Sequence, residues 1–362
     1  MAIAPPESQQ LEPETNGGYE PPPPSDQSRK QRFLYFLSRS WLFVFLLLLV
    51  LYFWLSTPPN TFLTTSNLSQ IALTTSEVVL LAIGETFVIV TAGIDLSIGA
   101  ILFFAGVAGG EVMLTLSGTS QQTINGQYPH ATLGIAVGIL VCILSGLAWG
   151  VFNGVVITRL RLPPIIVTLG TMAMAFGFGD LIDGGSYLPA PVPPSFSAGF
   201  GSGKFLGIYY PIWVAVLILG AAHLLFHRAR FGRYTAAIGS NSEGTRRTGI
   251  DVDRHIIKVY GLAGLLAGVA AVLDLAIFTN TTSVAHQTDN LSAISAVVIG
   301  GTSVFGGVGS VLLSAVGAFI PTVLQNGLVI KDVQPFWQEV VVGATIIIAV
   351  YLDQVRRRRM TH

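Results

Sequence analysis

Acidic side chains lie within the long apolar stretches of this sequence. Six of them fall inside or at the edge of such a stretch: Glu77, Glu85, Glu111, Asp180, Asp274 and Glu339. The interior of the stretches that carry these acids contains no lysine or arginine to pair with them. An acid in that setting is costly, so it typically hydrogen-bonds a neighbouring helix or faces a hydrated solute path. Both interpretations stay open for each acid, and the lack of fixed positive charge favours neutral polyols or cations over anionic cargo.

Neutral polar residues accompany the acids and supply further hydrogen-bond donors and acceptors. A hydroxylated neutral solute requires both kinds of group along its path. We therefore predict a translocation path lined by Glu85, Thr86, Asp95, Asn153, Thr168, Thr171, Thr302, Ser303, Gln325 and Asn326.

Two glycine-rich segments interrupt the apolar pattern. The first, TAGIDLSIGA at 91–100, joins two apolar stretches, and Asp95 or Ser97 is placed to cap the helix that follows. The second, VVIGGTSVFGGVGS at 297–310, contains five glycines and breaks a short apolar stretch. Broken helices at membrane depth are tolerated where their backbone faces protein or a water-lined path, so these segments indicate either a translocation site or tightly packed turns.

The composition requires that lipid surrounds the elements carrying these residues. Of 362 residues, 51% are hydrophobic and only 10% are charged, against about 25% in an ordinary soluble chain. A membrane helix needs roughly 20 apolar residues, which predicts an all-α integral membrane protein with about ten transmembrane helices, at least one of them broken. We place the spans at 33–55, 68–91, 96–116, 131–158, 165–182, 209–226, 256–278, 291–301, 310–327 and 336–352, the eighth being too short for a regular crossing.

The basic residues predict the orientation of these spans. With the amino terminus inside, 17 of the 19 lysines and arginines fall in cytoplasmic segments, and only Lys204 and Lys331 fall outside. Both termini are therefore predicted to be cytoplasmic. Residues 1–28 read as a disordered tail, 29–355 as the membrane domain, and 356–362 as a basic tail. The loop 184–207, rich in Gly, Pro and Ser, is expected outside and without regular structure.

Glycine spacing predicts which helix faces approach one another. Gly146, Gly150 and Gly154 recur at intervals of four in GLAWGVFNG, and GLAGLLAG places further glycines at 261, 264 and 268. Glycines on one face let helix backbones come close together. We interpret both motifs as packing surfaces rather than chemical sites.

Several functional classes are excluded by what the motifs lack. The nearest approach to a phosphate loop, AGFGSGKFLG, begins with Ala198, has Phe205 where a hydroxyl residue should hold magnesium, and is extracellular. No metal-ligand spacing or nucleophile motif is evident, and Cys142, in an apolar run, reads as a small buried residue. The zero net charge gives no case for nucleic acid. We predict a protein that is not an enzyme, with no metal or cofactor of its own.

The longest internal cytoplasmic connection, 228–258, indicates a partner-binding element. Its centre at 240–249 has a Ser-Asn-Ser start that resembles a helix cap, an acid at Glu243 and the basic pair Arg246 and Arg247 before Gly249. A short amphipathic helix on the membrane face is expected here. It is either a solvated connection or a docking helix for a cytoplasmic partner.

Five segments in order resemble one family: GETFVIVTAGIDLSIGA, WGVFNGVVITRLRLPPIIVTLGTMA, GRYTAAIGSNSEGTRRTGI, ISAVVIGGTSVFGGVGS and FWQEVVVGATIIIAVYLD. Together they are similar to the permease subunit of bacterial ribose-type sugar ABC importers, within the superfamily that also contains branched-chain amino acid permeases. The resemblance extends from about residue 33 to the end. The counterpart of GIDLS differs in the amino acid branch, which favours the sugar branch.

The resemblance implies partners and a location. The family pairs with a second permease copy or a paralogue, a cytoplasmic ABC ATPase with tandem nucleotide domains that holds ATP and Mg, and an extracytoplasmic sugar-binding protein. It functions in the bacterial cytoplasmic (inner) membrane, and its ATPase docks on the loop assigned here to 229–255. The implied coupling residues are Gly239, Ser240, Asn241, Glu243, Gly244, Thr245, Arg246, Arg247 and Gly249.

The implied function is ATP-driven import of a neutral monosaccharide, a ribose-like pentose or a hexose. Two departures from the family pattern bear on it: Gly244 and Thr245 replace alanines in the docking loop, and Asn290 and Ser292 replace two carboxylates of a Glu-Leu-Asp-Ala-Ile-Ala segment. The second departure leaves the sugar open. The alternatives are an ion-coupled secondary transporter of a neutral polar solute, an ABC importer of a nucleoside or other cargo, and a scaffold that does not transport.

Overall fold

The computed structural model describes residues 41–185, 188, 190–334 and the separate positions 337, 340, 341, 343, 344, 347 and 351. The described residues from Leu42 onward belong to one compact unit. The predicted tails at 1–28 and 356–362 lie outside the described residues, as do the start of the first predicted span and most of the last. Their assignments stay predictions.

Helices make up almost all of the described chain. The long ones are α3 (Thr65–Val90), α4 (Ile98–Ser117), α6 (Ala131–Leu160), α7 (Pro164–Asp183), α9 (Tyr210–His227) and α12 (Val252–Phe278). A shorter apolar helix, α2 (Trp41–Ser56), precedes them, and the pair α14 (Val311–Gly317) and α15 (Phe319–Ile330) follows. Among the described residues, seven segments are long and apolar enough to cross a membrane, if α14 and α15 count as one. This agrees with the predicted fold class, while the total of about ten spans stays a prediction.

Short elements fill the connections. They are α5 (Ser120–Ile124), α8 (Pro194–Phe196), a π-helical turn (Ser197–Gly201), the hairpin of β1 (Lys204–Phe205) and β2 (Ile208–Tyr209), α10 (Arg230–Ser240), α11 (Ser242–Arg247), a 3₁₀ turn (Val284–His286) and α13 (Asp289–Ile299). The expectation that 184–207 lacks regular structure was therefore wrong in part. A hydrogen bond from Tyr210 N to the carbonyl of Gly203 closes this hairpin at 3.0 Å.

The predicted eighth span is α13, and its 11 residues confirm that it is too short for a regular crossing. After Ile299 the chain turns through 300–310, where Gly301, Gly306 and Gly307 have positive φ angles. The interruption expected at 297–310 is therefore present. Helices α14 and α15 meet at Ala318, whose backbone is still helical and whose N–H donates to the carbonyl of Ser314 at 3.0 Å.

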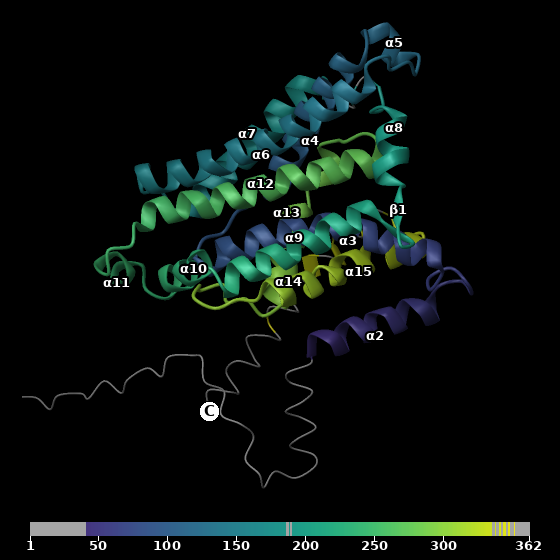
Figure 1. Cartoon of the computed structure of the whole chain (residues 1–362). Helices are drawn as coiled ribbons and strands as arrows, with labels where there is room; N and C mark the ends of the chain where they lie inside the picture. The colour runs from purple at the N-terminus through teal and green to yellow at the C-terminus, as the bar shows by residue number, and fades with distance from the viewer. Residues whose placement is uncertain are drawn as a thin grey trace, which may run out of the picture. The chain divides into compact units, whose positions relative to one another are not determined.

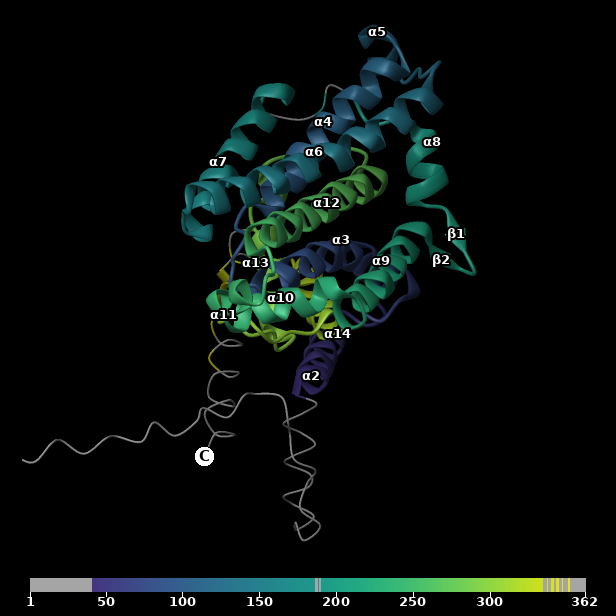
Figure 2. The same cartoon turned by 60° about the vertical axis from the view of Figure 1, so that its left-hand side comes forward.

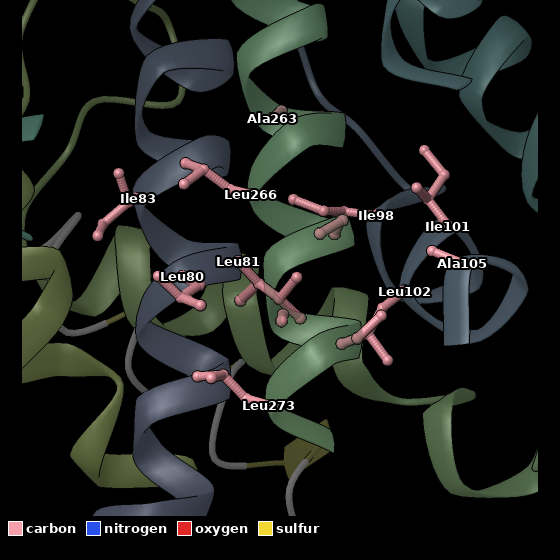
Figure 3. Close-up of a cluster of buried hydrophobic side chains, with 14 of the residues drawn as sticks. Leu80, Leu81, Ile83, Ile98, Ile101, Leu102, Ala105, Ala263, Leu266 and Leu273 are labelled. Carbon is pink, nitrogen blue, oxygen red and sulfur yellow. The ribbon is translucent and has the colours of Figure 1, made fainter. Parts of the chain in front are cut away.

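Helix α12 lies between two groups of helices, with α4, α6 and α7 on one side and α3, α9 and α14 on the other (Figures 1 and 2). Apolar side chains of α3, α4 and α12 meet where these helices pack (Figure 3). Leu81, Ile98 and Leu273 are examples, each with at most 1% of its surface exposed. In contrast, most residues of α6, α7 and α9 are not buried inside the protein. Helix α3 is buried along most of its length, so its polar residue Glu85 is shielded from the surface of the protein.

The predicted glycine faces of α6 and α12 pack against each other. A Cβ atom added at Gly146 would lie 2.8 Å from the Cα of Gly268, and one at Gly154 would lie 2.6 Å from the Cα of Ile257. A Cβ at Gly150 would collide with the carbonyl oxygen of Tyr260. These contacts are with backbone atoms, which cannot move aside as a side chain can. The interpretation of both motifs as packing surfaces is confirmed.

We expect the Gly150→Leu substitution to destabilise the α6–α12 contact. Overpacking a close helix contact costs about 1–3 kcal/mol, which is large against the marginal stability of a folded domain. The purified variant should therefore lose its fold at a lower temperature than the wild type in a detergent thermal-shift measurement. Gly170→Leu on α7 is the matched control, because no atom lies within 4 Å of its added Cβ. Equal melting temperatures of the two variants would contradict the packing role of Gly150.

Candidate functional site

The segment between α3 and α4 folds into the protein interior. Asp95 and Ser97 have no exposed surface, although the segment is polar. A Cβ added at Gly93 would lie 2.7 Å from the hydroxyl oxygen of Tyr260 on α12, so the close approach to that helix requires glycine. The first glycine-rich segment is therefore a tightly packed turn that carries buried polar groups.

A hydrogen-bonded cluster holds this turn in place, and we call Glu85, Asp95, Ser97 and Asn153 the buried polar cluster. The backbone N–H of Asp95 donates to Glu85 Oε1 at 3.2 Å. Asp95 Oδ1 accepts from the backbone N–H and the hydroxyl of Ser97, at 2.9 and 2.5 Å. Asn153 Nδ2 on α6 then donates to Ser97 Oγ at 2.8 Å. The cluster thus joins α3 and α6 through the turn.

The capping prediction for this turn was wrong. Ser97 occupies the position before α4, but its side chain makes no bond to the first turn of the helix. Its hydroxyl donates to Asp95 instead, because the buried carboxylate is the stronger acceptor. Asp95 Oδ1 also accepts a hydrogen bond from the backbone N–H of Ser97.

Several polar atoms of this region have no hydrogen-bond partner among the described residues. They are Glu85 Oε2, Asp95 Oδ2, Asn153 Oδ1 and Tyr260 Oη. Leaving a buried polar atom unpaired costs about 1–3 kcal/mol, so this region is poised to accept hydrogen bonds from any solute or water that reaches it. The chemistry available here is hydrogen bonding to hydroxyl or amide groups.

Removing the Asp95 carboxylate should destabilise the protein. In Asp95→Ala, the backbone N–H and the hydroxyl of Ser97 both lose their acceptor, at an expected total cost of about 2 kcal/mol. The melting temperature in detergent should fall. Asp95→Asn is the matched control, since its amide oxygen still accepts from Ser97 and more of the stability should remain. A melting temperature equally depressed in both variants would indicate that charge rather than these hydrogen bonds matters.

The other predicted path residues lie in separate places. Thr168 on α7 donates to the carbonyl of Ile94 at 3.3 Å, and so extends the buried polar cluster. Thr171 donates to the carbonyl of Thr168 at 3.2 Å. Thr86 donates to Ser314 Oγ on α14 at 2.9 Å, so it bonds to α14 rather than to the buried polar cluster. The structure therefore brings Glu85, Asp95, Asn153 and Thr168 together, whereas Thr86 bonds to α14 and Thr171 bonds within α7.

The remaining members are not part of that group. Thr302 Oγ1 accepts from the backbone N–H of Ser310 at 3.4 Å, and the backbone N–H of Ser303 donates to the carbonyl of Val308 at 2.9 Å, both within the loop 300–310. On α15, Asn326 exchanges hydrogen bonds with Asn67 at 2.9 and 3.0 Å. Gln325, also on α15, lines a separate cavity, which is described below.

The coupling segment contains two helices where one was expected. Asn241 caps α11 by accepting from the backbone N–H of Gly244 at 2.7 Å, as the Ser-Asn-Ser start predicted. Glu243 lies in the first turn, and Arg246 and Arg247 lie in the last. Thr245 is buried and donates to the carbonyl of Asn241 at 2.8 Å, while Gly249 follows the helix with a φ of +86°. The predicted helix is confirmed over Ser242–Arg247.

The charged residues of α11 are available to a partner. The side chains of Glu243 and Arg247 are 69% and 77% exposed and form an ion pair at 3.2 Å. Arg246 pairs with Asp253 at 2.7 Å, and this hydrogen bond raises the pKa of its guanidinium. Exposed ion pairs contribute little to stability, typically 0–1 kcal/mol. The charged side chains of α11 are therefore available to interact with another protein chain.

Helix α10 was missed, and it is the element that reaches the end of α3 and the glycine-rich loop 300–310. Its residue Gly239 packs so closely that an added Cβ would collide with the carbonyl oxygen of Val90 and lie 2.5 Å from Gly307 N. Gly307 N itself donates to the carbonyl of Val90 at 2.9 Å. Ser240 lies beside Gly307. The end of α10 thus contacts both the end of α3 and the loop 300–310.

Sequence reasoning missed several residues that hold the site. Tyr260, Ser314 and Asn290 contact it from α12, α14 and α13. Asn290 Nδ2 donates to the carbonyl of Leu96 at 3.1 Å, so the amide that replaces the family's glutamate fixes the buried turn. The altered segment was a signal that pointed to Asn290. Tyr260 gave no signal, because an aromatic residue in an apolar helix is ordinary.

Comparisons with known proteins agree with this architecture. A family profile described as "Branched-chain amino acid transport system / permease component" matches residues 67–350. The ribose import permease protein of Escherichia coli K12 is 34% identical over 327 residues, which cover 88% of this chain and 96% of that protein. No solved structure gives a significant match.

Relatives with other sugars in their names match nearly as well. The galactose/methyl galactoside import permease protein of Escherichia coli K12 is 32% identical over 339 residues, 91% of this chain and 98% of that protein. The D-allose transport system permease protein of the same strain is 35% identical over 311 residues, 86% of this chain and 90% of that protein. Identity is therefore similar for relatives named for a pentose and for hexoses.

Proposed function

Because the chain belongs to the family of branched-chain amino acid transport system permease components, in the branch of sugar ABC permeases, we propose that it is the membrane subunit of an ATP-driven importer of a neutral monosaccharide. The observation that carries the proposal is the contact of α10 with both the end of α3 at Val90 and the glycine-rich loop at Gly307. Through this contact, the exposed helix α11 is connected by way of α10 to α3, which carries Glu85 of the buried polar cluster.

In this proposal, a separate cytoplasmic ATPase with tandem nucleotide domains binds α11 and hydrolyses ATP with Mg. An extracytoplasmic binding protein delivers the sugar, and a second permease copy or a paralogue completes the membrane unit. Both termini lie in the cytoplasm, and the protein resides in the bacterial inner membrane. The coupling residues are those of 239–249, and the path residues are the ten predicted from the sequence.

The mechanism follows from close packing. Movement of α11 shifts α10, and Gly239 transmits that shift to Val90 and Gly307 because no side chain separates their backbones. Val90 ends the helix that bears Glu85, and the turn after it bears Asp95. A displacement at this point therefore rearranges the buried polar cluster, and the bundle alternates between two packed arrangements rather than deforming continuously.

The chemistry of the cluster suits a neutral hydroxylated cargo. Its unpaired atoms are acceptors and one phenol hydroxyl, and the described residues of the cluster carry no cationic side chain. A weak site of this kind lets the cargo pass, whereas selectivity resides in the binding protein. The relatives' names span ribose, galactose and allose, so the particular monosaccharide is assigned by experiment.

Reconstitution tests the proposal. The permease, its ATPase and its binding protein are placed in proteoliposomes, and uptake of radiolabelled D-ribose, D-galactose and D-allose is measured with and without ATP. Uptake of at least one sugar that requires both ATP and the binding protein supports the proposal. Uptake by the permease alone, driven by a proton or sodium gradient, would establish an ion-coupled transporter instead. ATPase binding without movement of any solute would indicate a scaffold.

A further inference from the structure

A polar cavity lies about two turns of α3 away from Glu85. Its volume is about 350 Å³, at the lower end of the range typical of small-molecule sites. Glu77 lines it from α3, Asp274 from α12 and Gln325 from α15, and the connection between α12 and α13 completes the wall. Glu77 and Asp274 belong to neither the buried polar cluster nor the coupling segment.

The cavity lies toward the end of the bundle opposite the coupling helices. Helix α12 begins just after α11 and ends at Phe278 in the cavity wall, and α11 lies at one end of α12 in Figure 1. In the same way, α3 reaches α10 at Val90, whereas Glu77 lies in its other half. With the proposed orientation, the cavity faces the side from which cargo arrives.

Two buried carboxylates in the wall of this cavity have unpaired oxygens. Glu77 is 8% exposed and Asp274 is 3% exposed. Glu77 Oε1 and Asp274 Oδ2 have no hydrogen-bond partner among the described residues. A buried carboxylate without a partner is expensive, so these atoms are the ones that a ligand would satisfy.

His286 lies beside Asp274 but does not satisfy these unpaired oxygens. Its Nδ1 contacts Asp289 Oδ2 at 2.7 Å, and its Nε2 contacts Thr281 Oγ1 at 2.8 Å. Asp274 Oδ2 is 3.6 Å from Nε2, which is too long for a hydrogen bond. The imidazole is therefore occupied by other partners, and the acceptors of Glu77 and Asp274 stay open.

We infer that this cavity, here named the access cavity, binds one molecule of a neutral polyhydroxylated solute such as a monosaccharide, with Glu77 and Asp274 accepting hydrogen bonds from its hydroxyl groups. The inference rests on the proposed function and identifies where the cargo first binds the permease. Hydrogen bonds from hydroxyls to carboxylates are among the stronger ones in proteins. Gln325 and Thr74 complete the set with groups that also donate to sugar oxygens.

The other ligand classes fit the access cavity less well. An anion would be repelled by its carboxylates. In the part of the chain that the structure describes, no three His, Cys, Asp or Glu side chains are arranged to hold a metal ion. A sugar presents several hydroxyl donors at once, and it is the ligand that matches several open acceptors in a cavity of this size.

A transport ratio tests the inference. The complete complex is reconstituted in proteoliposomes, and labelled D-ribose, D-galactose or D-allose taken up is divided by ATP hydrolysed in the same vesicles. Losing a charged acceptor weakens sugar binding about tenfold, so sugar released by the binding protein escapes and the ratio falls several-fold in Glu77→Gln and in Asp274→Asn. Glu111→Gln on α4 is the matched control, because it makes the same exchange outside the access cavity.

The outcomes separate this inference from the proposed function. If the wild-type complex moves no sugar, the proposed function fails and this inference falls with it. If the wild type moves sugar and both amide variants keep its ratio, the inference alone is overturned. Because the ratio is taken per ATP hydrolysed, a variant that folds in smaller yield does not mimic the expected result.

A labelling experiment decides the case in which an amide variant is inactive. Cys142 is the single cysteine and is fully buried, so an introduced thiol is labelled selectively by a membrane-impermeant maleimide. Ala285 is exposed and lines the access cavity, and Ile124 is 60% exposed on α5 outside it. A sugar that the complex transports should slow the labelling of Ala285→Cys but not of Ile124→Cys. Equal labelling with and without sugar, or slowing by sodium ions only, would overturn the inference.

Discussion

Replacing Gly239 by alanine should uncouple ATP hydrolysis from transport. The added Cβ collides with the carbonyl oxygen of Val90 and lies 2.5 Å from Gly307 N, so α10 must move away from the end of α3 and from the loop 300–310. Because three backbones meet here, no side chain can rotate to relieve the collision. We expect the amount of sugar moved per ATP hydrolysed to fall at least about tenfold, the equivalent of about 1.4 kcal/mol.

The measurement compares two alanine variants in the reconstituted complex. Gly220→Ala on α9 is the control, since its added Cβ has no atom within 4 Å and the same methyl group is gained. Normal coupling in the Gly239 variant would show that this contact does not transmit movement. Loss of coupling in both variants would show that any added methyl group on these helices is harmful, and would also contradict the specific role of Gly239.

Removing the charges of α11 should abolish ATPase stimulation. In the double variant Glu243→Ala, Arg246→Ala, the docking helix loses an exposed acid and a guanidinium that Asp253 holds in position. The side-chain cap from Asn241 Oδ1 is untouched, so α11 should still form. We expect the ATPase activity stimulated by the loaded binding protein to fall to its unstimulated level in the assembled complex, a loss of more than about tenfold, as desolvated interface charge pairs permit.

Two controls separate docking from local folding. Asp253→Asn removes the Arg246 ion pair but leaves the guanidinium in place, and an exposed pair contributes only about 0–1 kcal/mol. This variant should keep most of the stimulation. Arg159→Ala on α6 removes a basic residue outside the coupling segment and should have no effect. Normal stimulation in the double variant would refute the docking assignment of α11.

Predictions that depend only on neighbouring residues were the ones confirmed. Hydropathy over roughly 20 residues is a local property, and the predicted spans at 68–91, 131–158 and 165–182 agree with α3, α6 and α7 to within a few residues. The glycine faces of α6 and α12 were also predictable, because intervals of three and four repeat on one side of any helix. The Asn241 cap is local for the same reason.

Predictions that depended on distant contacts were less complete. The cap of α4 was assigned from neighbouring residues, whereas Ser97 bonds to Asp95 and Asn153 in the folded protein. Helix α10 was missed because its sequence looks like a polar connection. One side of it is buried: Thr235 contacts His255 on α12 at 2.9 Å. That contact becomes visible only when α12 is in place.

The sequence by itself determined that the chain spans a membrane, where its long helices lie and which glycine faces pack, since composition, length and periodicity are properties of contiguous residues. Its motifs also determined the family, and the comparisons confirm this assignment. Only the tertiary structure decided that Gly239 touches Val90 and Gly307, and that Glu77 and Asp274 line one cavity. The reason is physical. Contacts between segments far apart in the chain depend on how the helices pack, and many packings are compatible with the same apolar patterns.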